Sequence, residues 1–109
     1  MKAAGQVRIV LVTCGTLLEG RRIAGAVVRK RLAACVSMVL GPVQSIYQWK
    51  GKVETAREHL LIIKTTRASV AALEREVLRL HSYDLPEFLV LPASAASNEY
   101  LSWVTGSVR

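Results

Sequence analysis

Two cysteines and two histidines are the side chains of this sequence best suited to binding a soft metal ion: Cys14, Cys35, His59 and His81. Copper(I) favours thiolate and copper(II) favours imidazole, so Cys35 and His81 are candidate copper ligands. They lie far apart in the sequence, and no local spacing brings them together. Each also has a purely structural interpretation. A cationic His81 near a helix C-terminus complements the helix dipole, and Cys35 is a small apolar residue at the start of a strand.

A second set of side chains could surround a small ligand. Tyr47 and Trp49 stand two residues apart and therefore point to the same face of a strand. Aromatic residues in such positions commonly anchor subunit interfaces. The alternative is a cleft between subunits in which Lys64 and Arg31 hold an anion, since small ligands bind in clefts of this kind. The candidate cleft residues are Arg31, Tyr47, Trp49, Lys64, Tyr83 and Glu87.

Other classes of function lack the residues they need. No set of nucleophile, base and orienting group is visible and no glycine-rich phosphate loop is present, so we expect a binding protein and not an enzyme. The net charge of +7 comes from basic residues spread along the chain, which we interpret as solvated surface. An RNA-binding domain of similar element order needs aromatic residues on its central strands, and 8–12 and 59–65 contain none. No specific nucleic-acid partner is expected.

The composition indicates one domain with more apolar surface than it can bury alone. The chain has 109 residues, of which 51% are hydrophobic, and its mean hydropathy of +0.30 is high for so small an interior. A membrane or another subunit must cover the surplus, and no apolar run reaches the roughly 18–20 residues that span a bilayer. Two cysteines are too few for a disulfide framework, which favours a cytoplasmic protein with reduced thiols.

The elements that must position these side chains follow from hydrophobic periodicity. We expect a flexible leader over 1–6 and one domain over 7–109. Outside the centre of the chain, the patterns predict a strand over 7–14, a helix over 18–31, a helix over 69–81, a strand over 88–91 and a short C-terminal helix beginning near Ser97.

A hairpin of unusual length occupies the centre of the chain. Its segments in order are strand 36–40, the break Gly41-Pro42, strand 43–49, the turn Lys50-Gly51-Lys52 and strand 53–66. Strands commonly have about five or six residues, so the tip of this hairpin must project beyond the sheet. Tyr47 and Trp49 lie there with little of their own domain to cover them, which predicts pairing with other copies of the chain.

Two helices crossing over between four strands give the order βαββαβ. This is the split βαβ arrangement of a ferredoxin-like sandwich, so the predicted class is α+β, with a long projecting hairpin between the second and third strands.

Six strings, taken in their order and spacing, resemble the CutA family of divalent-cation tolerance proteins. They are RLAACV at 31–36, SIYQWKGK at 45–52, IKT at 63–65, LHSYDLPE at 80–87, LP at 91–92 and YLSW at 100–103. The resemblance extends over nearly the whole chain, from 7 to 103. Six strings in register are far more specific than any one of them.

The resemblance implies a homotrimer of ferredoxin-like subunits whose long strands pair across subunits, similar in architecture to the trimeric nitrogen-signalling PII proteins. It also implies a role in tolerance to divalent metals, copper above all, with copper or another divalent cation as a ligand. The alternative is a PII-like regulatory module that binds an anionic metabolite in clefts between subunits and has no native metal role.

The residues linked to copper in members of that family are only partly present. Those members carry a cysteine in the first strand, two positions before Cys14, where this chain has Val12. They also carry a histidine pair followed by proline, where this chain has Leu80-His81 followed by Ser82. The resemblance therefore implies metal tolerance without implying an intact copper site.

Overall fold

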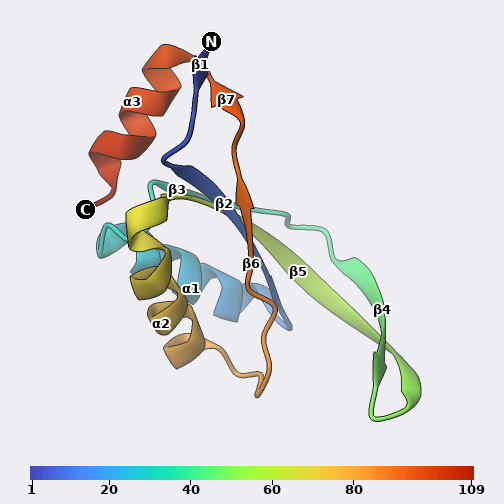
Figure 1. The fold of residues 1–109 in the computed structure, drawn as a ribbon. Coiled ribbons are helices and arrows are strands. Elements are labelled where there is room, and N and C mark those ends of the chain that lie inside the picture. Colours follow the sequence, from blue (N-terminus) through green and yellow to red (C-terminus); the bar gives the residue numbers. More distant parts are fainter.

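An antiparallel sheet in the order β3-β5-β2-β6 forms the centre of the molecule, and β4 pairs with the outer half of β5 (Figure 1). The computed structural model describes residues 1–109. Its elements are β1 (Lys2–Ala3), β2 (Val7–Cys14), α1 (Leu17–Arg29), β3 (Cys35–Met38), β4 (Val43–Trp49), β5 (Lys52–Thr66), η1 (Arg67–Ser69), α2 (Val70–Leu80), β6 (Leu89–Pro92), β7 (Ala95–Ala96) and α3 (Asn98–Ser107). This arrangement confirms the predicted α+β, ferredoxin-like class.

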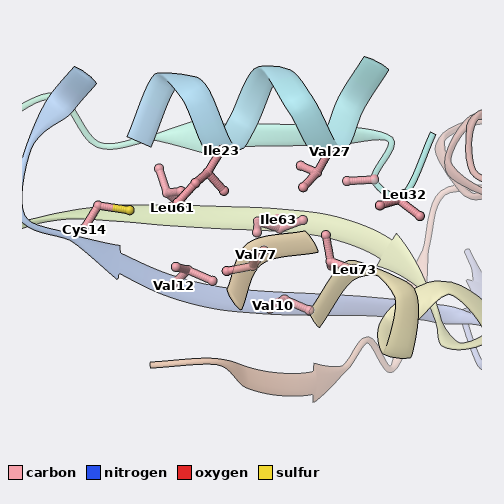
Figure 2. Packing of buried hydrophobic residues seen from close by; sticks show 11 residues of the cluster. Val10, Val12, Cys14, Ile23, Val27, Leu32, Leu61, Ile63, Leu73 and Val77 are labelled. Atoms are coloured by element: carbon pink, nitrogen blue, oxygen red, sulfur yellow. The ribbon is translucent and has the colours of Figure 1, made fainter. Parts of the chain in front are cut away.

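Helices α1 and α2 cover one face of the sheet and enclose the main core (Figures 1 and 2). Strand β2 alternates so that Val10, Val12 and Cys14 face the helices and are fully buried. Their partners from β5 and the helices are Leu61, Ile63, Ile23, Val27, Leu73 and Val77. None of the helices is both long enough and apolar enough to cross a membrane.

The predicted hairpin is present, and its tip projects beyond the helices (Figure 1). Strand β5 has 15 residues. Its second half pairs with β2 and β3, whereas its first half pairs with β4 alone, from Trp49↔Lys52 to Val43↔Glu58. The turn requires positive φ at two positions, and Gly51, with φ of 80°, adopts it at least cost.

The segment expected as a flexible leader is tied to the body of the molecule. Strand β1 pairs with β7, and Ala4 is only 1% exposed. Ala4 packs in a second apolar cluster with Val104 and Val108 from the C-terminal segment. A single small alanine gives a weak pattern in the sequence, and the burial of Ala4 depends on Val104 and Val108. In Figure 1, α3 lies beside the N-terminal segment.

Helix α1 ends two residues earlier than predicted, at Arg29 instead of Arg31. Lys30 caps the helix, and Arg31 has φ of 57°, the left-handed region that non-glycine residues rarely adopt. The Arg31 guanidinium donates hydrogen bonds to the carbonyls of Gly106 (3.1 Å) and Ser107 (3.3 Å) at the end of α3. These bonds attach the C-terminal helix to the core. The left-handed turn itself is closed by the N–H groups of Arg31 and Leu32, which donate to the carbonyls of Val28 and Val27.

Candidate functional site

Cys14, Glu19 and His81 bring three potential metal donors into one small cluster. One donor atom from each lies within 4.8 Å of the other two. Cys14 ends β2, Glu19 lies in the first turn of α1, and His81 directly follows α2. The hydroxyl of Thr16 caps α1 by accepting a hydrogen bond from the Glu19 N–H (3.1 Å), which starts the helix close to the end of β2.

Hydrogen bonds hold the His81 ring in one orientation. Its Nε2 lies 2.7 Å from the carbonyl oxygen of Thr13 and must donate, because a carbonyl only accepts. The Tyr83 N–H donates to Nδ1 over 3.1 Å, so the ring is neutral with its proton on Nε2. Nδ1 also lies 3.6 Å from Oε1 of Glu19 and is therefore the ring nitrogen that faces the cluster.

The cluster contains a carboxylate oxygen without a partner and a thiol that keeps its proton. Oε2 of Glu19 accepts from the Ser82 N–H (3.2 Å), whereas Oε1 is buried and has no hydrogen-bond partner. Burial, followed by the charges of Glu19 and Glu58, raises the pKa of the Cys14 thiol to about 12. A cation placed here would give Oε1 a partner, draw the proton from Cys14 and take the Nδ1 lone pair of His81 in place of the Tyr83 N–H. With that exchange the donor set fits a metal ion.

A cleft of about 700 Å³ adjoins the cluster, between the hairpin and the loop that follows α2. It is lined by Thr13, Ser45, Ile46, Tyr47, Trp49, Glu58, Tyr83, Asp84, Leu85, Pro86 and Glu87. Tyr83 belongs to both places, because its ring lies against His81 with 4.7 Å between the centroids. The cleft and the cluster are thus neighbours, because Tyr83 and Thr13 line the cleft and also contact His81.

The lining of the cleft is acidic. It contains Glu58, Asp84 and Glu87 and no lysine, arginine or histidine. Glu58 is 7% exposed and accepts a hydrogen bond from the Tyr83 hydroxyl (2.9 Å). Burial and then the hydrogen bond to Glu58 raise the pKa of Tyr83 to about 12, and burial together with the Glu58 charge raises the pKa of Glu87. Carboxylates repel anions, so the part of the cleft that one chain supplies favours a cation. The anion site was expected between subunits and stays a prediction.

Comparison with known proteins identifies the family. The family model described as CutA1 divalent ion tolerance protein matches residues 8–107. This chain belongs to that family. It is similar to protein CutA 1, chloroplastic, of Oryza sativa subsp. japonica (43% identical over 101 residues) and to the divalent-cation tolerance protein CutA of Thermus thermophilus (43% over 96 residues). The solved structure of the divalent cation tolerance protein (Cut A1) from Thermus thermophilus matches with a TM-score of 0.92 at 39% identity, covering 94% of this chain and 99% of that one.

These CutA1 relatives differ in length. The match to the rice protein covers 93% of this chain and 56% of the relative, so this chain spans little more than half of that protein. The match to the Thermus thermophilus protein covers 88% of this chain and 92% of the relative. The shared part is therefore the CutA1 domain itself.

Four of the six cleft residues predicted for this CutA1 chain line one cleft: Tyr47, Trp49, Tyr83 and Glu87. The other two lie elsewhere. Lys64 donates to the hydroxyl of Ser37 on β3, and Arg31 donates to carbonyl oxygens at the end of α3. The two cations that were expected to hold an anion are thus absent from the lining.

The structure does not bring Cys35 to His81. Cys35 lies opposite Lys64 on β5, whereas Cys14 lies opposite His59. Residues 59 and 64 are about 17 Å apart along the strand, at about 3.4 Å per residue. Cys14 is therefore the thiol that joins His81, and the Cys35 thiol has one hydrogen-bond contact, to the hydroxyl of Ser37 at 3.9 Å.

The sequence patterns do not predict the roles of Glu19 and Glu58. Glu19 has the position of a residue that complements the dipole of α1, which conceals its approach to His81. Glu58 is easier to notice in the sequence. Every second residue of a strand points to the same face, so Glu58 shares a face of β5 with Leu60 and Ile62 and is a charged residue on an apolar face. His81 was expected to place a positive charge at the C-terminal end of α2. Arg22 does so instead, because its guanidinium donates to the Leu80 carbonyl (3.0 Å) at that end.

Proposed function

We propose that this CutA1-family protein contributes to divalent-cation tolerance by binding a divalent cation at the Cys14–Glu19–His81 cluster. The observation that carries the proposal is the buried Oε1 of Glu19, which has no partner in a group whose donors lie within 4.8 Å of one another. Buried polar atoms are normally satisfied, and a metal ion would satisfy this one. The protein is then a binding protein and not a catalyst.

The donor types narrow the choice of metal. A thiolate, an imidazole nitrogen and a carboxylate oxygen form a mixed set that suits zinc or copper and does not suit magnesium or calcium, which prefer oxygen alone. Copper(II) binds such sites more tightly than zinc in the usual order of divalent ions. Zinc is nevertheless the better first probe, because it has no redox chemistry with the thiol.

Calorimetric titration with zinc tests the site directly. We expect Cys14→Ser and Glu19→Gln each to weaken zinc binding at least about tenfold, because each removes one of three protein ligands. The matched controls are Cys35→Ser, the second thiol, and Glu74→Gln, an exposed carboxylate on α2. Equal affinities for Cys14→Ser, Cys35→Ser and the wild type would contradict the proposal.

The raised pKa of Cys14 makes the affinity depend on pH. The thiol is protonated at neutral pH, since its pKa is about 12, and must lose its proton to the solvent when a metal ion binds. The zinc affinity should therefore rise by about tenfold per pH unit between pH 6 and 8. Titrations in buffers with different enthalpies of ionisation should report the release of one proton, and a pH-independent affinity without proton release would exclude a Cys14 thiolate ligand.

We also propose that the protein assembles as a homotrimer, as the family resemblance implies. Strand β6 exposes Leu89, Val90 and Leu91, and the hairpin exposes Ile46 and Val53, which is more apolar surface than a soluble monomer commonly leaves uncovered. Light scattering at micromolar concentration should give three times the chain mass of 11.9 kDa. A stable monomer would contradict the proposal. The cytoplasmic location expected from the reduced thiols stays a prediction.

A further inference from the structure

Two buried side-chain atoms of the molecule lack a hydrogen-bond partner, Oε1 of Glu19 and Nδ1 of His59. Glu19 belongs to the proposed metal site. His59 is one of the two histidines of the chain, and its ring takes no part in the ion pairs of the molecule. Buried polar atoms are normally paired with protein, water or an ion, so Nδ1 of His59 is free to bind a ligand.

His59 lies directly beside Cys14. The two residues are Cα partners in the last pair of the β2–β5 ladder. Directly opposed residues of neighbouring antiparallel strands point to the same face, with Cβ atoms about 4.5–5.5 Å apart. This face is the one that α1 and α2 cover, because Cys14 packs there together with Leu61 and Ile63. His59 therefore points to the helix side of the sheet, and it does not line the acidic cleft.

Cys14 is the common neighbour of His59 and the other two donors. Its thiol belongs to the group with Glu19 and His81, whose donor atoms lie within 4.8 Å of one another, and His59 is next to it across the strand pair. The ring of His59 stands outside this group and must turn about its side-chain bonds to reach an ion bound there. The turn breaks no hydrogen bond of Nδ1, because this atom has none. Zinc bonds of about 2.3 Å to sulfur and about 2.0 Å to nitrogen are long enough to join donors on two paired residues.

We propose that His59 is the fourth protein ligand of the metal site and that the site is a closed zinc site. This inference rests on the proposed binding of a divalent cation at Cys14, Glu19 and His81. Three protein ligands leave one of the four positions around zinc open to water or substrate, as in catalytic sites. A fourth ligand from β5 fills that position, which is the arrangement of zinc sites that hold the ion without doing chemistry on it.

The four donors also balance the charge of the ion. The Cys14 thiolate and the Glu19 carboxylate carry two negative charges, and the two imidazoles bind in their neutral form. The complex with a dipositive ion is therefore neutral, which a buried position tolerates better than a net charge. The ligands come from the end of β2, the middle of β5, the first turn of α1 and the residue after α2. Bound zinc would join these four segments, so zinc should raise the melting temperature.

Nitrogen NMR of protein labelled in its histidine rings tests the fourth ligand in the wild type. The chain has two histidines, so the number of rings that respond to zinc can be counted directly. We expect one ring nitrogen of His59 and one of His81 to shift together, and both shifts to be complete at one equivalent of zinc. A response of His81 alone would overturn this inference and leave the three-ligand site standing. No response of either ring, with no heat of zinc binding in calorimetry, would overturn both.

His59→Leu measures what the fourth ligand contributes. Leucine suits the apolar inner face of β5 and replaces an unpartnered nitrogen, so the metal-free variant should melt no lower than the wild type. Its zinc affinity should fall at least about tenfold, because one protein ligand is lost. Arg57→Gln is the matched control, since Arg57 is exposed on the same strand, and it should bind zinc as the wild type does. Wild-type zinc affinity in folded His59→Leu would overturn the inference, whereas the loss of affinity in Cys14→Ser would still support the three-ligand site.

Discussion

Strand β5 passes through two environments, and the contrast between its halves explains much of the molecule. In the inner half, Leu61 and Ile63 are fully buried beneath α1 and α2. In the outer half, Val53 is 72% exposed, and only β4 pairs with the strand. Glu58 stands at the boundary. The inner half is stabilised by its own chain, whereas the outer half offers an aromatic and apolar ribbon for contact with other molecules.

The largest expected effect comes from truncating one apolar side chain in each half. Leu61→Ala should lower the free energy of unfolding by about 2–5 kcal/mol, because it leaves a cavity in the core. Val53→Ala should lower it by less than about 0.5 kcal/mol, because this side chain is exposed. Urea unfolding at one protein concentration compares the two. Equal losses of unfolding free energy in the two variants would contradict the difference between the halves of β5 and show that the hairpin tip is packed as tightly as the core.

A smaller effect is expected at the boundary between the halves. Tyr83→Phe removes the one hydrogen bond to the buried Glu58 carboxylate and should cost about 1 kcal/mol or more, the usual penalty for an unsatisfied buried acceptor. Tyr100→Phe is the control, because the Tyr100 side chain is 41% exposed. Thermal unfolding should separate the two variants. Identical melting temperatures would indicate that Glu58 is hydrated and does not depend on Tyr83.

The smallest effect concerns acid stability, because the two helices that cover the inner half of β5 are joined by an ion-pair network and the hairpin tip has none. Hydrogen bonds from Arg79 and then Lys30 lower the pKa of Glu76 in α2 to about 2, below its ordinary 4.5. A lowered pKa stabilises the folded state above the ordinary value, and this stabilisation is lost as the pH falls from about 4.5 to about 2. The pH profile of the melting temperature should be flatter for Glu76→Gln in that window.

Glu54→Gln is the control for this pH dependence, since Glu54 is an exposed hairpin carboxylate without an ion pair. Its profile should follow that of the wild type. A profile for Glu76→Gln that also follows the wild type would show that the network with Lys30 and Arg79 does not contribute to acid stability.

The fold was largely predictable because its signals are local. Alternation in β2, the three-and-four spacing of α1 and α2, and the turn at Gly51 depend on neighbouring residues alone. The same is true of the tip, where Tyr47 and Trp49 share a face because the side-chain period of a strand is two. One error, at the end of α1, was itself local: the N–H groups of Arg31 and Leu32 donate to the carbonyls of Val28 and Val27, and this cap usually has glycine where the chain has Arg31. The leader is different, because its burial depends on the distant C-terminal segment.

The candidate sites were only half predictable for the same reason. The sequence by itself determined the elements, the projecting hairpin and four residues of the cleft, because all of these follow from spacing along one or two segments. Only the tertiary structure decided that Cys14, and not Cys35, meets His81, since this depends on the register of β2 against β5. It also decided that the cleft is acidic. The charge of a cleft is set by which distant side chains converge on it, and no pattern along the chain contains that information.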